Sequence, residues 1–238
     1  IDATATGGII LGDAAANVGT EAVALDINST AALTINRDIE EVAGGGAAGA
    51  ITIDDDASGA APDTVTFKKV IGASVAPNTI TVGTAGGTGG HAVFEAAVVA
   101  GAIGVNGGDA SEVSTVDFQA ASTGTITLND DDAIAKAIFS ADATATIASA
   151  IADGADGEGT VQVTGTGKTF TGAIGTISTF DADATTSVLN TLDARIIDVA
   201  TGATLTTDDD FTGDATTVNG TGKIIFGIDA GGAQTTAV

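Results

Sequence analysis

Hydrophobic and polar residues alternate in short runs along most of the chain, and several of these runs end in phenylalanine. They include Thr-Val-Thr-Phe at 64–67, Ala-Val-Phe at 92–94, Thr-Val-Asp-Phe at 115–118 and Ala-Ile-Phe at 137–139. A period of two residues is typical of a half-buried β-strand, in which alternate side chains point to one face. The pattern therefore predicts four short strands with related sequences.

A second set of strands is predicted between the phenylalanine runs, at 79–82, 102–105 and 125–128. Glycine-rich stretches separate the two sets. A unit of roughly 20 to 30 residues with two or three short strands and glycine corners is what one coil of a β-solenoid looks like in sequence. We therefore expect an all-β solenoid in which phenylalanines stack from coil to coil: Phe67, Phe94, Phe118 and Phe139.

The rest of the chain fits this organisation less regularly. Strands are predicted within 7–13, 21–26 and 31–37, and the alanine-rich stretch 144–152 reads as strand or as a helical turn. Within 184–199, four aliphatic residues fall at helical spacing and predict one short helix: Val188, Leu189, Leu192 and Ile196. No linker divides the sequence, so we expect a single repetitive β domain over residues 1–238.

One acidic pattern occurs three times. Gly124–Asp132 reads Gly-Thr-Ile-Thr-Leu-Asn-Asp-Asp-Asp, and related stretches occupy Gly49–Asp56 and Gly202–Asp210. Each copy has glycine, a Thr-aliphatic strand and three carboxylates, and the copies are nearly evenly spaced, so we interpret them as an architectural repeat.

Carboxylates at a turn are ligands that Ca²⁺ prefers, although aspartate also ends strands and keeps sheet edges soluble. The candidate calcium ligands are the acids of the three triplets: Asp54, Asp55, Asp56, Asp130, Asp131, Asp132, Asp208, Asp209 and Asp210. No other cofactor is expected.

The composition limits which side chains can form the core and which classes of partner the chain can bind. The formal net charge is −24, from 31 acids against seven bases, which disfavours nucleic acid and an anionic membrane surface. The sequence has eight Phe but no Trp, Tyr, Met or Cys, so the core must consist of small side chains and suits a narrow interior. The longest apolar run, 96–105, contains glycines and is far shorter than the roughly 20 residues of a membrane span.

The sequence contains few of the motifs that catalysis would require. His91 is the sole histidine and no Gly-x-Ser-x-Gly stretch presents a serine, so we interpret His91 as a corner residue. Gly165–Thr169 reads Gly-Thr-Gly-Lys-Thr, but position 162 is Gln where a phosphate-binding loop needs its first glycine. The related Gly-Thr-Gly-Lys stretch at 220–223 precedes Ile, and both copies predict β-corners. We expect a protein that is not an enzyme.

At Gly124–Asp132 and at the Asn-Gly-Thr-Gly-Lys-Ile-Ile-Phe stretch, 219–226, the sequence resembles the repetitive passenger regions of bacterial autotransporters and surface-layer proteins, including the rickettsial outer-membrane type. The resemblance is one of texture and spans most of the chain. It implies a β-helical extracellular fold with a structural or adhesive role, and it carries no catalytic residues.

These features lead to the expectation of a secreted or surface-displayed structural protein that assembles into a surface layer or filament. The apolar segments 7–11 and 223–228 are expected to be end strands, and unpaired end strands join subunits. One alternative is a β-sandwich that exchanges a strand with its neighbour. Another is an adhesin module that binds glycans or host surfaces through its loops. The chain begins with Ile1, so we expect a removed leader or an excised segment.

Overall fold

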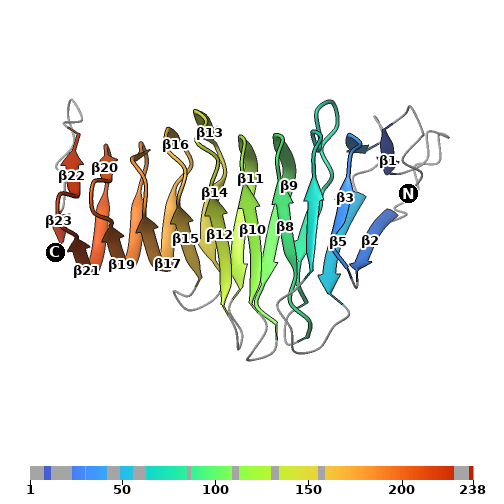
Figure 1. Cartoon of the computed structure of the whole chain (residues 1–238), viewed down its shortest axis with the longest axis horizontal. Coiled ribbons are helices and arrows are strands. Elements are labelled where there is room, and N and C mark those ends of the chain that lie inside the picture. Colours follow the sequence, from blue (N-terminus) through green and yellow to red (C-terminus); the bar gives the residue numbers. More distant parts are fainter. Residues whose placement is uncertain are drawn as a thin grey trace.

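The structure is a computed structural model that describes residues 8–11, 23–29, 31–41, 49–55, 63–84, 87–108, 113–129, 134–154, 159–227 and 236–237. Its strands stack in parallel into a β-solenoid of about eight turns (Figure 1). The fold class predicted from the repeat is therefore confirmed, and the β-sandwich alternative is not supported. The described residues form no helix, so they include none that could cross a membrane.

Each turn of the solenoid contributes to three parallel sheets, which we number from the phenylalanine strands. Sheet 1 contains β3 (Leu33–Ile35), β6 (Thr64–Phe67), β8 (His91–Phe94), β10 (Ser114–Phe118), β12 (Ala135–Phe139) and β15 (Thr160–Val163). Sheet 2 contains β2 (Val23–Ser29), β5 (Gly49–Asp55), β7 (Thr79–Val82), β9 (Val98–Asn106), β11 (Ser122–Asn129), β14 (Ala150–Asp153) and β23 (Thr236–Ala237).

Sheet 3 is the narrowest. It contains β1 (Ile9–Leu11), β4 (Ile39–Glu41), β13 (Ala145–Ile147), β16 (Lys168–Phe170), β18 (Thr186–Val188), β20 (Thr204–Thr207) and β22 (Lys223–Phe226). Between β4 and β13 it is reduced to isolated bridges, which join Ile39 to Ile71 and Ile71 to Val98, and to the first residues of β9 and β11, where Val98 pairs with Ser122. Three long strands pass from sheet 2 into sheet 1: β17 (Ile174–Ala182), β19 (Leu192–Val199) and β21 (Phe211–Val218).

The alternation seen in the sequence determines which side chains enter the core. In β6, buried Val65 and Phe67 alternate with half-buried Thr64 and Thr66, and β7 repeats the pattern. β-Branched threonine suits a strand position whose side chain lies against neighbours on the outer face of a sheet. The predicted strands at 64–67, 79–82, 92–94, 102–105, 115–118, 125–128 and 137–139 are all present.

The predicted phenylalanine ladder is confirmed. Phe67, Phe94, Phe118 and Phe139 stack with ring centroids 5.1, 5.4 and 5.3 Å apart and interplanar angles of 22°, 19° and 20°. The ladder then leaves sheet 1, because Phe170 of sheet 3 meets Phe139 edge-on at 4.9 Å. Phe170 in turn contacts Phe180 edge-on at 6.2 Å. One aromatic column therefore crosses the core and continues into the later coils.

Sheet 2 contributes a matching aliphatic row. Its fully buried members lie in register from coil to coil: Ile51, Ile80, Ile103, Ile126, Ile151, Ile174 and Leu192. Each side chain removed from water in this way contributes on the order of 1.5–3 kcal/mol. The small-residue core predicted from composition is thus built from repeated rows of one or two residue types.

The coils become shorter between β6 and β21, although Phe211 and its partner Thr236 in β23 are again 25 residues apart. Thr64 and His91, which are neighbours in sheet 1, are separated by 27 residues, whereas Gln162 and Asp181 are separated by 19. The difference arises at the corner between sheets 2 and 1. Separate strands connected by loops occupy this corner up to β15, and the continuous strands β17, β19 and β21 replace them (Figure 1).

This shortening explains why the later sequence looked irregular. The stretch 144–152 forms strands β13 and β14 rather than a helical turn. The helix predicted within 184–199 is wrong, because the segment forms β18 and β19. Val188 and Leu192 are buried, whereas Leu189 and Ile196 are 44% and 46% exposed, so the four residues do not share one face.

Gly124, the first residue of the central acidic stretch, lies at an irregular point in β11. The register to β9 shifts between Thr123 and Thr125, and Gly124 has a φ of 124°. A Cβ atom at this position would lie 2.2 Å from the carbonyl oxygen of Ala100 in the preceding coil. Glycine is therefore required where the strand turns from sheet 3 into sheet 2.

The stacked rings yield a stability prediction. Replacement of Phe118, which lies between two stacked phenylalanines and is 1% exposed, by alanine should lower the free energy of unfolding by about 3–5 kcal/mol. The matched control is Phe226→Ala, because Phe226 is 39% exposed and makes one edge contact, with Phe211. Urea titration followed by circular dichroism measures both. Equal losses for the two variants would contradict a dominant role for the ladder.

Candidate functional site

The acidic triplets do not form one repeated site. Asp54 lies near the end of β5 and accepts hydrogen bonds from two hydroxyls of the next coil, Thr84 Oγ1 at 2.7 Å and Thr88 Oγ1. Asp55 is the last residue of β5. Asp56, Asp130, Asp131 and Asp132 lie outside the described residues. In the described part of the first triplet, the carboxylate of Asp54 therefore connects one coil to the next by hydrogen bonds.

The third triplet occupies a different corner. Asp208 follows β20 of sheet 3, whereas the first triplet begins within β5 of sheet 2 and the second comes after β11 of sheet 2 in sequence. Its acids take part in the turn: the backbone N–H of Asp208 donates to the Val188 carbonyl, and that of Asp210 donates to Asp209 Oδ1. The interpretation of Gly202–Asp210 as a third equivalent copy is therefore wrong. Only Gly49–Asp56 and Gly124–Asp132 begin with equivalent strands.

Among the residues that the structure describes, no group of three or more His, Cys, Asp or Glu side chains is placed to hold a metal ion. Calcium binding by the triplets stays a prediction, since four of the nine candidate ligands lie outside that part of the chain.

A different set of residues, most of them polar, lies in register on the outer face of sheet 1. The row contains Val93, Asp117, Ile138, Gln162, Asp181, Asp198 and Thr217, one from each successive coil. We call this the outer row of sheet 1. The sequence alone did not reveal it, because its acids fall into line only when the unequal coil lengths are known. The available signal was a polar residue flanked by inward-facing apolar ones, as in Val116-Asp117-Phe118.

Amides lie between the acids of this row. Gln162 Nε2 donates to Asp181 Oδ2 at 3.2 Å and to Asp183 Oδ2 at 2.7 Å. Asn219 Nδ2 donates to Asp198 Oδ1 at 2.6 Å. Asp181 and Asp198 are direct neighbours in the parallel register. The amide donors thus offset part of the repulsion between carboxylates that stack in adjacent strands.

Burial raises the pKa of Asp181, and the nearby carboxylates of Asp183 and Asp198 raise it further. Lys136 and the hydrogen bond from Gln162 oppose this increase. Both leading causes disfavour the ionised form: partial burial removes water, and like charges repel. The outer row therefore stores unfavourable electrostatic energy at neutral pH.

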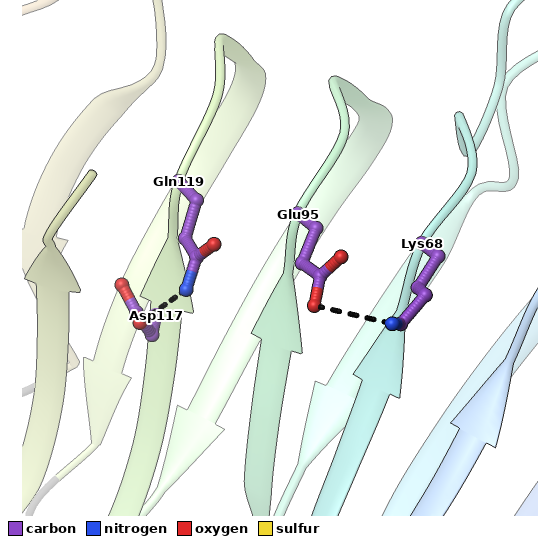
Figure 2. A network of polar contacts seen from close by, with 4 residues as sticks. All are labelled: Lys68, Glu95, Asp117 and Gln119. Carbon is purple, nitrogen blue, oxygen red and sulfur yellow. Dashed lines mark hydrogen bonds and ion pairs between the residues drawn. The ribbon is translucent and has the colours of Figure 1, made fainter. Parts of the chain in front are cut away.

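Polar contacts continue at the end of the sheet 1 strands in the earlier coils. Figure 2 shows Lys68 Nζ paired with Glu95 Oε1 at 3.9 Å and Gln119 Nε2 donating to Asp117 Oδ2 at 3.3 Å. Ser140 Oγ donates to the same oxygen of Asp117 at 2.8 Å from the following coil. Each of these contacts connects residues within one coil or in two successive coils. Exposed ion pairs such as Lys68–Glu95 contribute about 0–1 kcal/mol.

His91 is not a corner residue. It is the first residue of β8, and its Nδ1 lies 3.2 Å from Thr64 Oγ1 of the preceding coil. Burial lowers the pKa of His91, while the negative charge of Asp117 acts in the opposite direction. Through the contact with Thr64 the imidazole serves as one more link between coils.

The Gly-Thr-Gly-Lys stretches form corners, as predicted. Thr166 and Gly167 make a turn that leads into β16, and the second copy makes a turn that leads into β22. Lys168 is only 1% exposed, and its Nζ donates to the Ala143 carbonyl at 3.1 Å. Burial lowers the pKa of Lys168. An ammonium used in this way spans a corner and is not presented to a phosphate group in solvent.

The fold and these contacts define the class of protein: a parallel β-solenoid whose polar residues connect successive coils. No protein-family model, curated protein or solved structure gives a significant match to the chain.

The electrostatic strain at Asp181 can be tested by Asp181→Asn. A carboxyl with a raised folded-state pKa contributes stability below its ordinary value, near 3.8, and loses this contribution as pH rises through the folded-state pKa. At neutral pH the asparagine variant should therefore be more stable than the parent, by about 0.5 kcal/mol. At pH values below the ordinary aspartate range the two proteins should match.

Thermal unfolding across this pH range measures the difference. The control is Asp214→Asn, since Asp214 is exposed on β21 and outside the outer row. A stability gain of the same size in the control would trace the effect to net charge rather than to the row.

Proposed function

We propose that this chain is a structural subunit of an extracellular surface layer or filament, and that subunits associate end to end through unpaired strands. The observation that carries the proposal is the last turn that the structure describes. Within the described residues, β22 pairs with β20 on one side and with no strand on its other side. The second half of β21 likewise pairs with β19 alone. Unpaired strand edges are templates for another chain.

Side chains at this end support the same proposal. Val218 continues the row that runs through Phe67, Phe94 and Phe118, yet it is 44% exposed. Phe226 lies in the inward row of sheet 3 and is 39% exposed, with Ile225 beside it at 48%. Another coil stacked on this surface would cover Val218 and Phe226 as the preceding coils cover their counterparts.

The net charge favours contact between subunits at their ends rather than along their sides. With a net charge of −24, lateral contact between two copies brings like charges together. The last strand of sheet 3, Lys223–Phe226, carries one positive charge and three large apolar residues. Contact at the end therefore incurs less repulsion, and a head-to-tail contact that does not close produces a filament or a lattice. The textural resemblance to autotransporter passengers and surface-layer proteins supports an extracellular location.

A second candidate is an adhesin module that binds glycans or host surfaces through loops. The observation in its favour is that the loop connections β5–β6, β7–β8, β9–β10, β11–β12 and β14–β15 all lead from sheet 2 to sheet 1. Insertions on one edge of a solenoid are often used for binding. Glycan-array binding by the monomeric chain would favour this function over assembly.

Assembly can be tested by placing a charge on the end surface. Val218→Lys should abolish or greatly reduce polymers, because a buried unpaired ammonium opposes stacking of the next coil. The matched control is Ile196→Lys: Ile196 is 46% exposed but lies on the outer face of sheet 1 within the stack. Sedimentation velocity and electron microscopy report the outcome. Polymers that persist in Val218→Lys, or a parent chain that stays monomeric with and without Ca²⁺, would overturn the proposal.

Calcium is the proposed ion for the acidic corners. If the triplets bind it, the melting temperature should rise in Ca²⁺, by an amount equivalent to about 2.7 kcal/mol when the ion is at 100 times its dissociation constant. Mg²⁺ at the same ionic strength is the control, because it screens charge equally but demands a tighter, octahedral set of ligands. Coincident melting curves in Ca²⁺, Mg²⁺ and chelator would eliminate the metal site.

A further inference from the structure

Two asparagine-glycine pairs occur in the chain, Asn106-Gly107 and Asn219-Gly220. This dipeptide is chemically labile. The backbone nitrogen of the glycine can attack the side-chain Cγ of the asparagine, because glycine has no Cβ to obstruct the approach. The two pairs lie at comparable points, just where a strand ends, but their surroundings differ.

The first pair is restrained on every atom that the reaction needs. Asn106 Nδ2 donates to the Gly83 carbonyl at 3.0 Å, and Asn106 Oδ1 accepts from Asn129 Nδ2 at 2.6 Å. The attacking nitrogen is engaged too, since the Gly107 N–H donates to the Asn129 carbonyl at 2.7 Å. Reaction at Asn106 requires that all three hydrogen bonds break in the interior of the stack.

The second pair is restrained by fewer hydrogen bonds. Asn219 is exposed and follows β21, in the last complete turn of the described chain. Its Nδ2 donates to Asp198 Oδ1 at 2.6 Å, but among the described residues Asn219 Oδ1 and the Gly220 N–H have no hydrogen-bond partner. Gly220 has a φ of 55° within the turn, and the Gly222 N–H donates to the Asn219 carbonyl at 2.8 Å.

We propose that Asn219 is a site of spontaneous deamidation, and that the resulting carboxylate faces Asp198 and loosens the last turn of the solenoid. The Gly220 nitrogen forms a bond to Cγ of Asn219 and gives up its proton, and the side-chain amide leaves as ammonia. Solvent water then opens the cyclic imide at either carbonyl, which gives aspartate or isoaspartate. No oxidant or reductant takes part.

The consequence follows from the contact that is lost. In the parent chain the amide of Asn219 donates to Asp198. After conversion two carboxylates occupy these positions, beside a row in which Asp181 and Asp198 already repel each other. Isoaspartate also adds a methylene to the backbone at the turn into β22. Both changes weaken the end of the stack, whether or not that end joins another subunit.

The test compares the two sites within one molecule. Purified chain is incubated in mildly alkaline buffer, in the folded state and in concentrated urea, and peptide mapping by mass spectrometry follows both asparagines. In urea the two sites should convert at similar rates. In the folded protein Asn106 should convert about tenfold more slowly than Asn219, or slower still. Equal rates at the two sites in the folded protein, or slower conversion at Asn219, would overturn the assignment.

The structural consequence has its own measurement. Asn219→Asp reproduces one product, and amide hydrogen exchange should become faster in β21 and β22 while exchange in β8 and β10 stays unchanged. Asn219→Gln is the control, since it keeps an amide and does not form the five-membered imide. Unchanged exchange in β21 and β22 of Asn219→Asp would show that the last turn tolerates the new charge and would overturn this part of the proposal.

Discussion

The structure depends on the register between coils. In the described strands most inward side chains lie over a counterpart in the coil before, so the interior consists of rows that run along the solenoid. The parallel backbone bonds fix these rows, and apolar burial stabilises them. The aromatic row illustrates how strict the constraint is. When Val163 takes the position that follows Phe139, the ring volume is supplied by Phe170 from sheet 3 and Phe180 from a neighbouring row of sheet 1.

The same constraint explains what sequence reasoning could recover. The four phenylalanines identified the coils from 64 to 139, because a large side chain with one allowed position marks the repeat unambiguously. Leu189 and Ile196 led to the wrong prediction of a helix within 184–199. They are apolar but exposed, and together with Val188 and Leu192 they imitate a helical face although a tight corner separates two strands. A period cannot be assigned when the chain changes direction within the window used to measure it.

The prediction that the three acidic triplets are equivalent was wrong for a related reason. Strands of sheets 2 and 3 have the same alternation of threonine and aliphatic residues, so local texture does not reveal to which sheet a strand belongs. That assignment depends on the number of residues around each coil, and the number changes along the chain. The outer row of sheet 1 was missed for the same reason, because Asp117, Asp181 and Asp198 are irregularly spaced in sequence and lie in one row only through the register of the coils.

The shortening of the coils has a geometric consequence. Turns of 27 residues give way to turns of 19, whereas Phe211 and its partner Thr236 are again 25 residues apart, so the perimeter changes along the solenoid while the inward rows keep their register. The change falls at one edge, the corner between sheets 2 and 1. The two directions along this edge are therefore not equivalent, and a partner that lies along it would bind in one orientation.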